Sequence, residues 1–81
     1  MLEAAQIRAA RALLGWRRET LAREAKVGLA TVARMEQGEG VVQGNVSTIV
    51  KIQTALERAG ISFVAVQNET IGVTLRKRAP S

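Results

Sequence analysis

Hydrophobic residues recur at intervals of three and four over the first part of the chain, which is the spacing of one face of an α-helix. Ile7, Ala10 and Leu14 show this spacing first. It returns in three later segments; Asn45 precedes the last of them as a good N-cap, and Gly60 follows it in position for a left-handed stop. The pattern predicts helices over about residues 4–14, 18–25, 29–37 and 46–59.

Beyond Gly60 the period changes to the short, β-branched apolar runs that are typical of strands. Residues 61–66 form the first run, and residues 67–72 contain the polar residues and the glycine of a turn. Residues 73–76 form the second run. The sequence therefore predicts a β-hairpin over residues 61–78.

Both faces of the first predicted strand are apolar, with Phe63 on one face and Val64 on the other. A two-stranded hairpin is marginal in water by itself, so both faces need cover. We expect the helices to cover one face and a second copy of the chain to cover the other. The expected dimer interface consists of Ile61, Phe63, Val64, Val66, Val73 and Leu75.

The predicted fold is mainly α, with a helical domain over residues 1–60 followed by the short hairpin over residues 61–78. A chain of 81 residues can build only a small core, and it has no cysteine with which to cross-link that core. We therefore expect a homodimer interface to contribute to its stability.

The segment from Arg18 to Glu36 has the pattern of two short helices joined by a sharp turn. Its inward positions are Leu21, Ala22, Ala25, Val27, Val32 and Met35. It resembles the helix-turn-helix of the Cro and lambda-repressor (XRE-type) family, whose pattern runs Gln-x-x-Leu-Ala-x-x-x-Gly-Val-Ser-x-x-Thr-Val-x-x-x-Glu-x-Gly. The residues that match this pattern are Leu21, Ala22, Val27, Thr31, Val32, Glu36 and Gly38.

The resemblance implies a four-helix lambda-repressor-like domain and a transcriptional regulator that binds double-stranded DNA. Such a protein would be a repressor that binds a two-fold operator as a homodimer, with residues 29–37 as its recognition helix. The resemblance also implies a structural ion pair between Arg11 and Glu36. A second interpretation stays open, in which the chain is a protein-interaction module, such as an antitoxin or co-regulator, that docks another protein through its hairpin.

The recognition helix would turn Val32 and Met35 inward and present its opposite face to the major groove. Arg34 is the one side chain on that face able to make a bidentate contact to guanine. The expected base-reading residues are Leu29, Ala30, Ala33 and Arg34. The expected contacts to the DNA backbone come from Arg17, Arg18, Thr20, Arg23, Gly28, Thr31, Gln37, Gln43, Asn45 and Ser47.

The charge of the chain suits a polyanionic partner. Twelve Lys and Arg against seven Asp and Glu give a net charge of +5, with a pI near 11.2. The positive residues gather in the segment 17–34 and again at Arg76, Lys77 and Arg78. For any one of these side chains taken alone, an ordinary solvated charge is the more probable interpretation.

The composition also argues against catalysis. The chain has no His, Cys or Tyr, which excludes thiol and imidazole nucleophiles and the usual zinc sites. Its carboxylates are scattered, and its glycines form no nucleotide-binding motif. We therefore expect no enzyme activity, no cofactor and no metal.

Membrane insertion and secretion are not indicated either. No apolar run approaches the roughly 20 residues that a transmembrane helix needs. The N-terminal residues lack the charged start and the long apolar centre of a signal peptide. These features predict a cytoplasmic protein without membrane contact.

Overall fold

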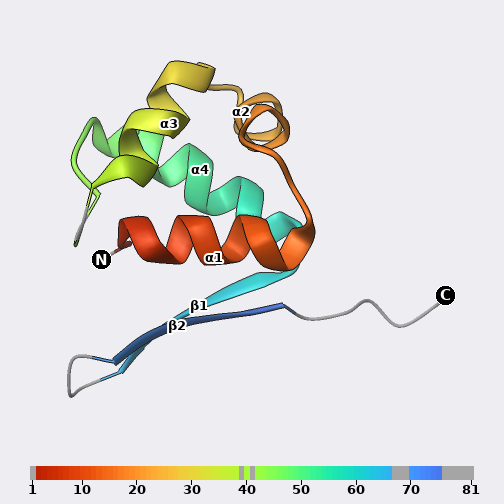
Figure 1. Ribbon diagram of the computed structural model, residues 1–81, viewed down its shortest axis with the longest axis vertical. Helices are drawn as coiled ribbons and strands as arrows, with labels where there is room; N and C mark the ends of the chain where they lie inside the picture. The colour runs from red at the N-terminus through yellow and green to blue at the C-terminus, as the bar shows by residue number, and fades with distance from the viewer. Residues whose placement is uncertain (1, 39, 41, 67–69, 76–81) are drawn as a thin grey trace, which may run out of the picture.

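The computed structural model describes residues 2–38, 40, 42–66 and 70–75, with the backbone alone described for residues 64–66, 70 and 71. The described part of the chain is mainly helical and ends in a two-stranded antiparallel hairpin (Figure 1). The elements are α1 (Ala4–Leu14), α2 (Arg18–Ala25), α3 (Leu29–Gln37), α4 (Val46–Arg58), β1 (Ile61–Val66) and β2 (Thr70–Leu75). This coarse architecture is the one predicted from the hydrophobic pattern. Among the described residues, none of the helices has the length and apolar character needed to span a membrane.

The predicted boundaries differ from the observed ones at two places. Helix α4 ends one residue before the predicted end, and Ala59 forms its cap. Strand β2 begins at Thr70, whereas the sequence placed residues 70–72 in the turn. Thr70 pairs with Val66 in the ladder, because a β-branched residue is favourable in a strand even beside polar neighbours. The expected end of the hairpin at residues 76–78 lies outside the described residues.

Local signals in the sequence set the ends of the helices. The side chain of Asn45 accepts a hydrogen bond of 2.8 Å from the amide of Ser47, which makes Asn45 the N-cap that the sequence predicts for α4. Helix α1 ends at Gly15, whose φ of 67° is the left-handed conformation that glycine adopts easily. Helix α2 ends at Lys26 in the same conformation, with φ 59°, although Lys26 has a side chain. The corner between α2 and α3 is therefore a position of backbone strain.

All the helices contribute to one core. The side chains that the helices bury most completely come from α1, α2, α3 and α4 in turn and include Ile7, Leu21, Val32, Ile52 and Leu56. Helix α1 lies between α3 on one side and β2 on the other, while α2 packs against both α3 and α4 (Figure 1). This arrangement leaves the outer face of α3 and the start of α2 uncovered.

The hairpin packs on the helices through the face that carries Ile61 and Phe63. Ile61 pairs with Leu75 and Phe63 pairs with Val73, and all four contact the helical core. Ile61 is buried and the other three are half-buried. Gln6 of α1 adds a polar link, because its Nε2 donates to the carbonyl oxygen of Gly72 at 3.0 Å.

This packing corrects one part of the expected dimer interface. Ile61, Phe63, Val73 and Leu75 are used within a single chain, so a second copy could contact only the parts of the last three that remain exposed. Alternation along a strand shows which residues share a face, but it does not show which face the helices cover. The side chains of Val64 and Val66, the other two expected interface residues, lie outside what the structure describes.

Candidate nucleic-acid interface

Helix α3 has one buried face and one exposed face. Val32, Met35 and Glu36 are buried, which places the opposite side of the helix at the surface. Leu29, with 46% of its surface exposed, lies at the start of that opposite side. Of the four expected base-reading residues, Leu29, Ala30 and Arg34 are exposed and Ala33 is half-buried.

The start of α3 carries free backbone donors. Gly28 is its N-cap and supplies no side-chain cap, while its carbonyl oxygen accepts from the amides of Thr31 and Val32. That leaves the amides of Leu29 and Ala30 as the free donors, since no backbone bond is made by either in the described structure, and the first amides of a helix carry partial positive charge. Gly28 is exposed and Thr31 is half-buried, so the expected backbone contacts at this end of α3 are at least partly accessible.

The start of α2 adds positive side chains. Arg17 is the N-cap residue, Arg18 is the first helical residue, and both are exposed. Arg23, in the last turn of α2, is exposed and 4.0 Å from Glu24, whereas Thr20 is half-buried. The guanidinium groups of Arg17 and Arg23 are therefore available to an anionic ligand.

The segment between α3 and α4 contributes polar groups. Gln37, Gln43 and Ser47 are exposed. Asn45 is exposed as well, but its side-chain oxygen already caps α4 and so is committed to Ser47. Backbone hydrogen bonds of 3.0 Å, from Ala4 to Gly40 and from Val42 to Leu2, tie this segment to the residues before α1.

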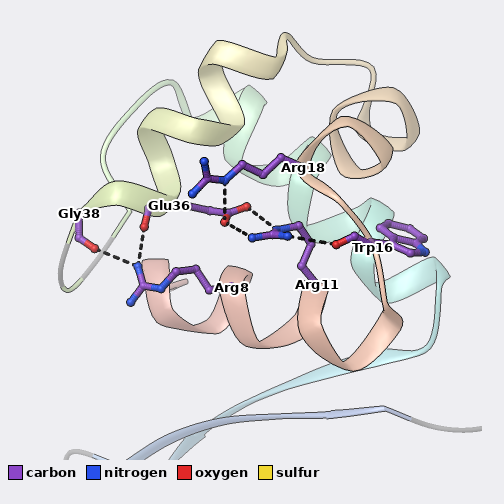
Figure 2. A network of polar contacts seen from close by, with 6 residues as sticks. All are labelled: Arg8, Arg11, Trp16, Arg18, Glu36 and Gly38. Atoms are coloured by element: carbon purple, nitrogen blue, oxygen red, sulfur yellow. Dashed lines mark hydrogen bonds and ion pairs between the residues drawn. The ribbon is translucent and has the colours of Figure 1, made fainter.

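A buried carboxylate lies beneath this surface. Glu36 has no exposed side-chain surface, and it accepts two hydrogen bonds from Arg11, at 2.9 Å from Nε and 2.7 Å from Nη2 (Figure 2). The structure thus brings Arg11 and Glu36 together in the ion pair implied by the family resemblance. Arg11 also donates from Nη1 to the carbonyl oxygen of Trp16 at 3.1 Å. One guanidinium therefore connects α1, α3 and the segment that leads into α2.

Two further arginines meet Glu36, and sequence reasoning did not predict either contact. Arg18 donates from Nε to the same carboxylate at 3.4 Å, and Arg8 donates from Nη1 to the carbonyl oxygens of Glu36 and Gly38 (Figure 2). The contact of Arg8 had a possible signal, because Arg8 is one turn before Arg11 and shares its face of α1. The contact of Arg18 had no such signal in the sequence, because it depends on the angle at which α2 crosses α3.

The electrostatics of this cluster are unbalanced. Two guanidinium groups, those of Arg11 and Arg18, contact the single carboxylate of Glu36, and the guanidinium of Arg8 lies on the backbone carbonyl of the same residue. Glu19 adds only a weaker attraction at Arg11. Hydrogen bonding to Glu36 raises the pKa of Arg11 above its ordinary value, and partial burial opposes that rise. The guanidinium of Arg11 therefore stays charged, and positive charge remains in excess where α2 and α3 meet.

The rest of the described surface has fewer features that indicate a binding site. A hollow of about 300 Å³ between α2 and α4 is lined in part by Lys26, Val50, Lys51 and Arg58. Three basic residues line it, but it lies beside the C-terminal half of α2, away from the cluster around Glu36. Within the described ranges, no group of three or more His, Cys, Asp or Glu residues is placed to hold a metal ion.

Comparison with known proteins adds no family to this description. The chain matches no protein-family model, and no curated protein matches it in sequence. The features that bear on function are therefore the exposed face of α3, the start of α2 and the charge of the chain.

Proposed function

We propose that this chain is a transcriptional regulator that binds double-stranded DNA, a repressor that acts in the cytoplasm as a homodimer on a two-fold operator. It would be a binding protein and not an enzyme. In this proposal α2 and α3 are a helix-turn-helix of the Cro and lambda-repressor type, and α3 enters the major groove. The observation that carries the proposal is the exposed face of α3, with Arg34 on it, beside the basic start of α2.

Physical chemistry supports this combination. An α-helix fits the major groove, and arginine is the side chain that most often reads guanine there. Positive side chains and free amides beside the helix match the phosphates on either side of the groove. The net charge of +5 adds a general attraction to DNA, which should weaken as salt is added.

The role of Arg34 provides the first test. A duplex selected from a random pool by the purified protein would supply the site, and binding would be followed by fluorescence anisotropy. Arg34→Ala should cost about 1 to 3 kcal/mol on that site and relax the preference at one base pair per half-site. Arg23→Ala, which also removes an exposed arginine, is the matched control and should weaken all sequences alike. Equal losses on all sequences for Arg34→Ala would reassign Arg34 to a phosphate.

The homodimer provides the second test. Two recognition helices about 34 Å apart would read successive major grooves on one side of the duplex. Ser62 and Thr74 are paired across the hairpin and both are exposed, so they lie on the face turned away from the helices. We therefore expect Thr74→Asp to dissociate the dimer without unfolding the chain, with sedimentation at micromolar concentration as the measurement. Phe63→Asp is a poor test, because Phe63 packs on the core of its own chain.

The same variant distinguishes the second interpretation. If Thr74→Asp leaves the oligomeric state and DNA protection unchanged but abolishes stable co-purification with an unrelated protein, the hairpin docks that protein. The chain would then be an interaction module such as an antitoxin or co-regulator.

A further inference from the structure

Arg18 differs from the other exposed arginines at this surface because one end of its guanidinium is held. Its side chain is 43% exposed, yet its Nε donates to the fully buried carboxylate of Glu36. Figure 2 shows its two terminal amino groups turned away from Arg11, at the outer end of the side chain. Within the described part of the chain, neither of these amino groups has a hydrogen-bond partner.

Glu36 does not need Arg18 for its own neutralisation. Arg11 already supplies a bidentate partner, with distances of 2.9 and 2.7 Å, and Arg18 is the longer contact at 3.4 Å. The carboxylate can therefore orient Arg18 while most of its own charge is balanced by Arg11. The charge of Arg18 remains available to an external anion.

We propose that Glu36 is a positioning residue for Arg18, and that it holds the two terminal amino groups of Arg18 as a fork for one DNA phosphate per half-site. This inference rests on the proposed DNA-binding function and names the group that fixes α2 on the backbone. A guanidinium matches two phosphate oxygens at once, whereas the ammonium of lysine acts as a point charge. The orientation of residue 18, and not its charge alone, should therefore determine the strength of the contact.

Arg17 is the matched control for this idea. It is the neighbouring residue, it is exposed, and it carries the same charge, but it makes no hydrogen bond to Glu36 in the described structure. Its contribution to DNA binding should come from charge alone. A change from arginine to lysine should then matter at position 18 and hardly at position 17.

The experiment compares the full-length protein with Arg18→Lys and Arg17→Lys on the selected duplex, by anisotropy at several salt concentrations. Arg18→Lys should weaken binding about tenfold, the loss expected for a charge-assisted bidentate contact, although the net charge is unchanged. Arg17→Lys should change binding by less than about threefold, as expected for a screened surface charge. Circular dichroism should show that both variants stay folded.

A second measurement locates the phosphate. Each backbone phosphate of the duplex is replaced in turn by a neutral methylphosphonate. One replacement per half-site should weaken the wild-type protein about tenfold and weaken Arg18→Lys clearly less, because the variant has lost the bidentate geometry and keeps only a point charge at that phosphate. A merely structural role for Arg18 would not depend on a single phosphate.

Glu36→Gln tests the positioning step. It keeps the size of the side chain but removes the charge that holds Arg18, so the penalty of Arg18→Lys should fall below about threefold in this background. If Glu36→Gln does not fold, the lysine comparison and the phosphate scan decide the question without it.

The possible outcomes distinguish the positioning role of Glu36 from the proposed DNA-binding function. If Arg18→Lys and Arg17→Lys behave alike and no phosphate is specific to Arg18, the positioning role of Glu36 is overturned while the proposed function stands. If the wild-type protein selects no duplex from the pool, the proposed function fails and this inference fails with it.

Discussion

The helical part and the hairpin bury their apolar residues to different degrees. The helices supply side chains without any exposed surface, such as Ile7, Leu21 and Leu56. In the described part of the hairpin only Ile61 is buried, while Phe63 and its neighbours across the ladder are half-covered. The helices therefore complete a core by themselves, and the sheet packs on the outside of that core.

The largest expected difference between the two parts comes from truncating one apolar side chain in each. Leu56→Ala in α4 should lower the free energy of unfolding by about 2 to 5 kcal/mol, because it leaves a cavity in a fully packed core. Val73→Ala in β2 should cost about 1 kcal/mol or less, since Val73 is only half-buried. Denaturant titrations would measure both values. Equal losses would mean that the hairpin is as integral to the core as α4.

The next effect tests the polar centre of the helical part. Glu36→Ala should cost about 3 kcal/mol, because it leaves Arg11 and Arg18 without their buried partner. Part of the cost is relieved by water, since the side chain of Arg11 is 21% exposed. Glu57→Ala is the control, because Glu57 is exposed and its side chain accepts, from the described residues, a single hydrogen bond of 3.4 Å from Gln53. A cost for Glu36→Ala no greater than that of the control would show that the cluster does not stabilise the fold.

A smaller effect of opposite sign is expected at the corner between α2 and α3. Lys26→Gly should raise the free energy of unfolding by about 0.5 to 1 kcal/mol, because glycine adopts a φ of 59° without the strain that a side chain causes. Thermal unfolding would detect the change. A loss of stability would mean that the side chain of Lys26 makes contacts worth more than the strain.

The smallest effect is expected at the start of α4. Val46 is 74% exposed although it lies in the well-packed half of the molecule. Val46→Ser should change the free energy of unfolding by no more than about 0.5 kcal/mol, as for most surface positions. A larger loss in the same denaturant titration would indicate that Val46 is covered in solution, for instance by a second copy of the chain.

Prediction from sequence succeeded where the relevant physics is local. Helical spacing located α1, α2 and α3, and the capping preference of Asn45 located the start of α4. The start of β2 was predicted too late, because the residues near position 70 are typical of a turn. Pairing with β1 overrides this local preference. Local sequence signals fix the ends of a helix or strand only where no contact with a distant segment changes them.

The candidate site was predictable to a lesser extent. Periodicity placed Arg34 on the exposed face of α3, and the family resemblance paired Arg11 with Glu36. The contact between Arg18 and Glu36 joins two helices whose crossing the sequence does not encode in any short motif. The face of the hairpin that meets the helices depends in the same way on packing over long sequence distances.

The position of helix α1 allows the hairpin and the proposed DNA-facing helices to influence each other. Gln6 on this helix bonds to β2, while Arg8 and Arg11 on the same helix bond to the end of α3. A single helix, α1, therefore connects the hairpin to α3. If α1 shifts when the hairpin is engaged, the affinities at the two ends of the molecule become linked, and each ligand changes the binding of the other by the same factor. A double-mutant cycle between Gln6→Ala and Arg8→Ala, with DNA affinity as the readout, would measure this linkage, and strictly additive losses would show that the contacts of Gln6 and Arg8 act independently.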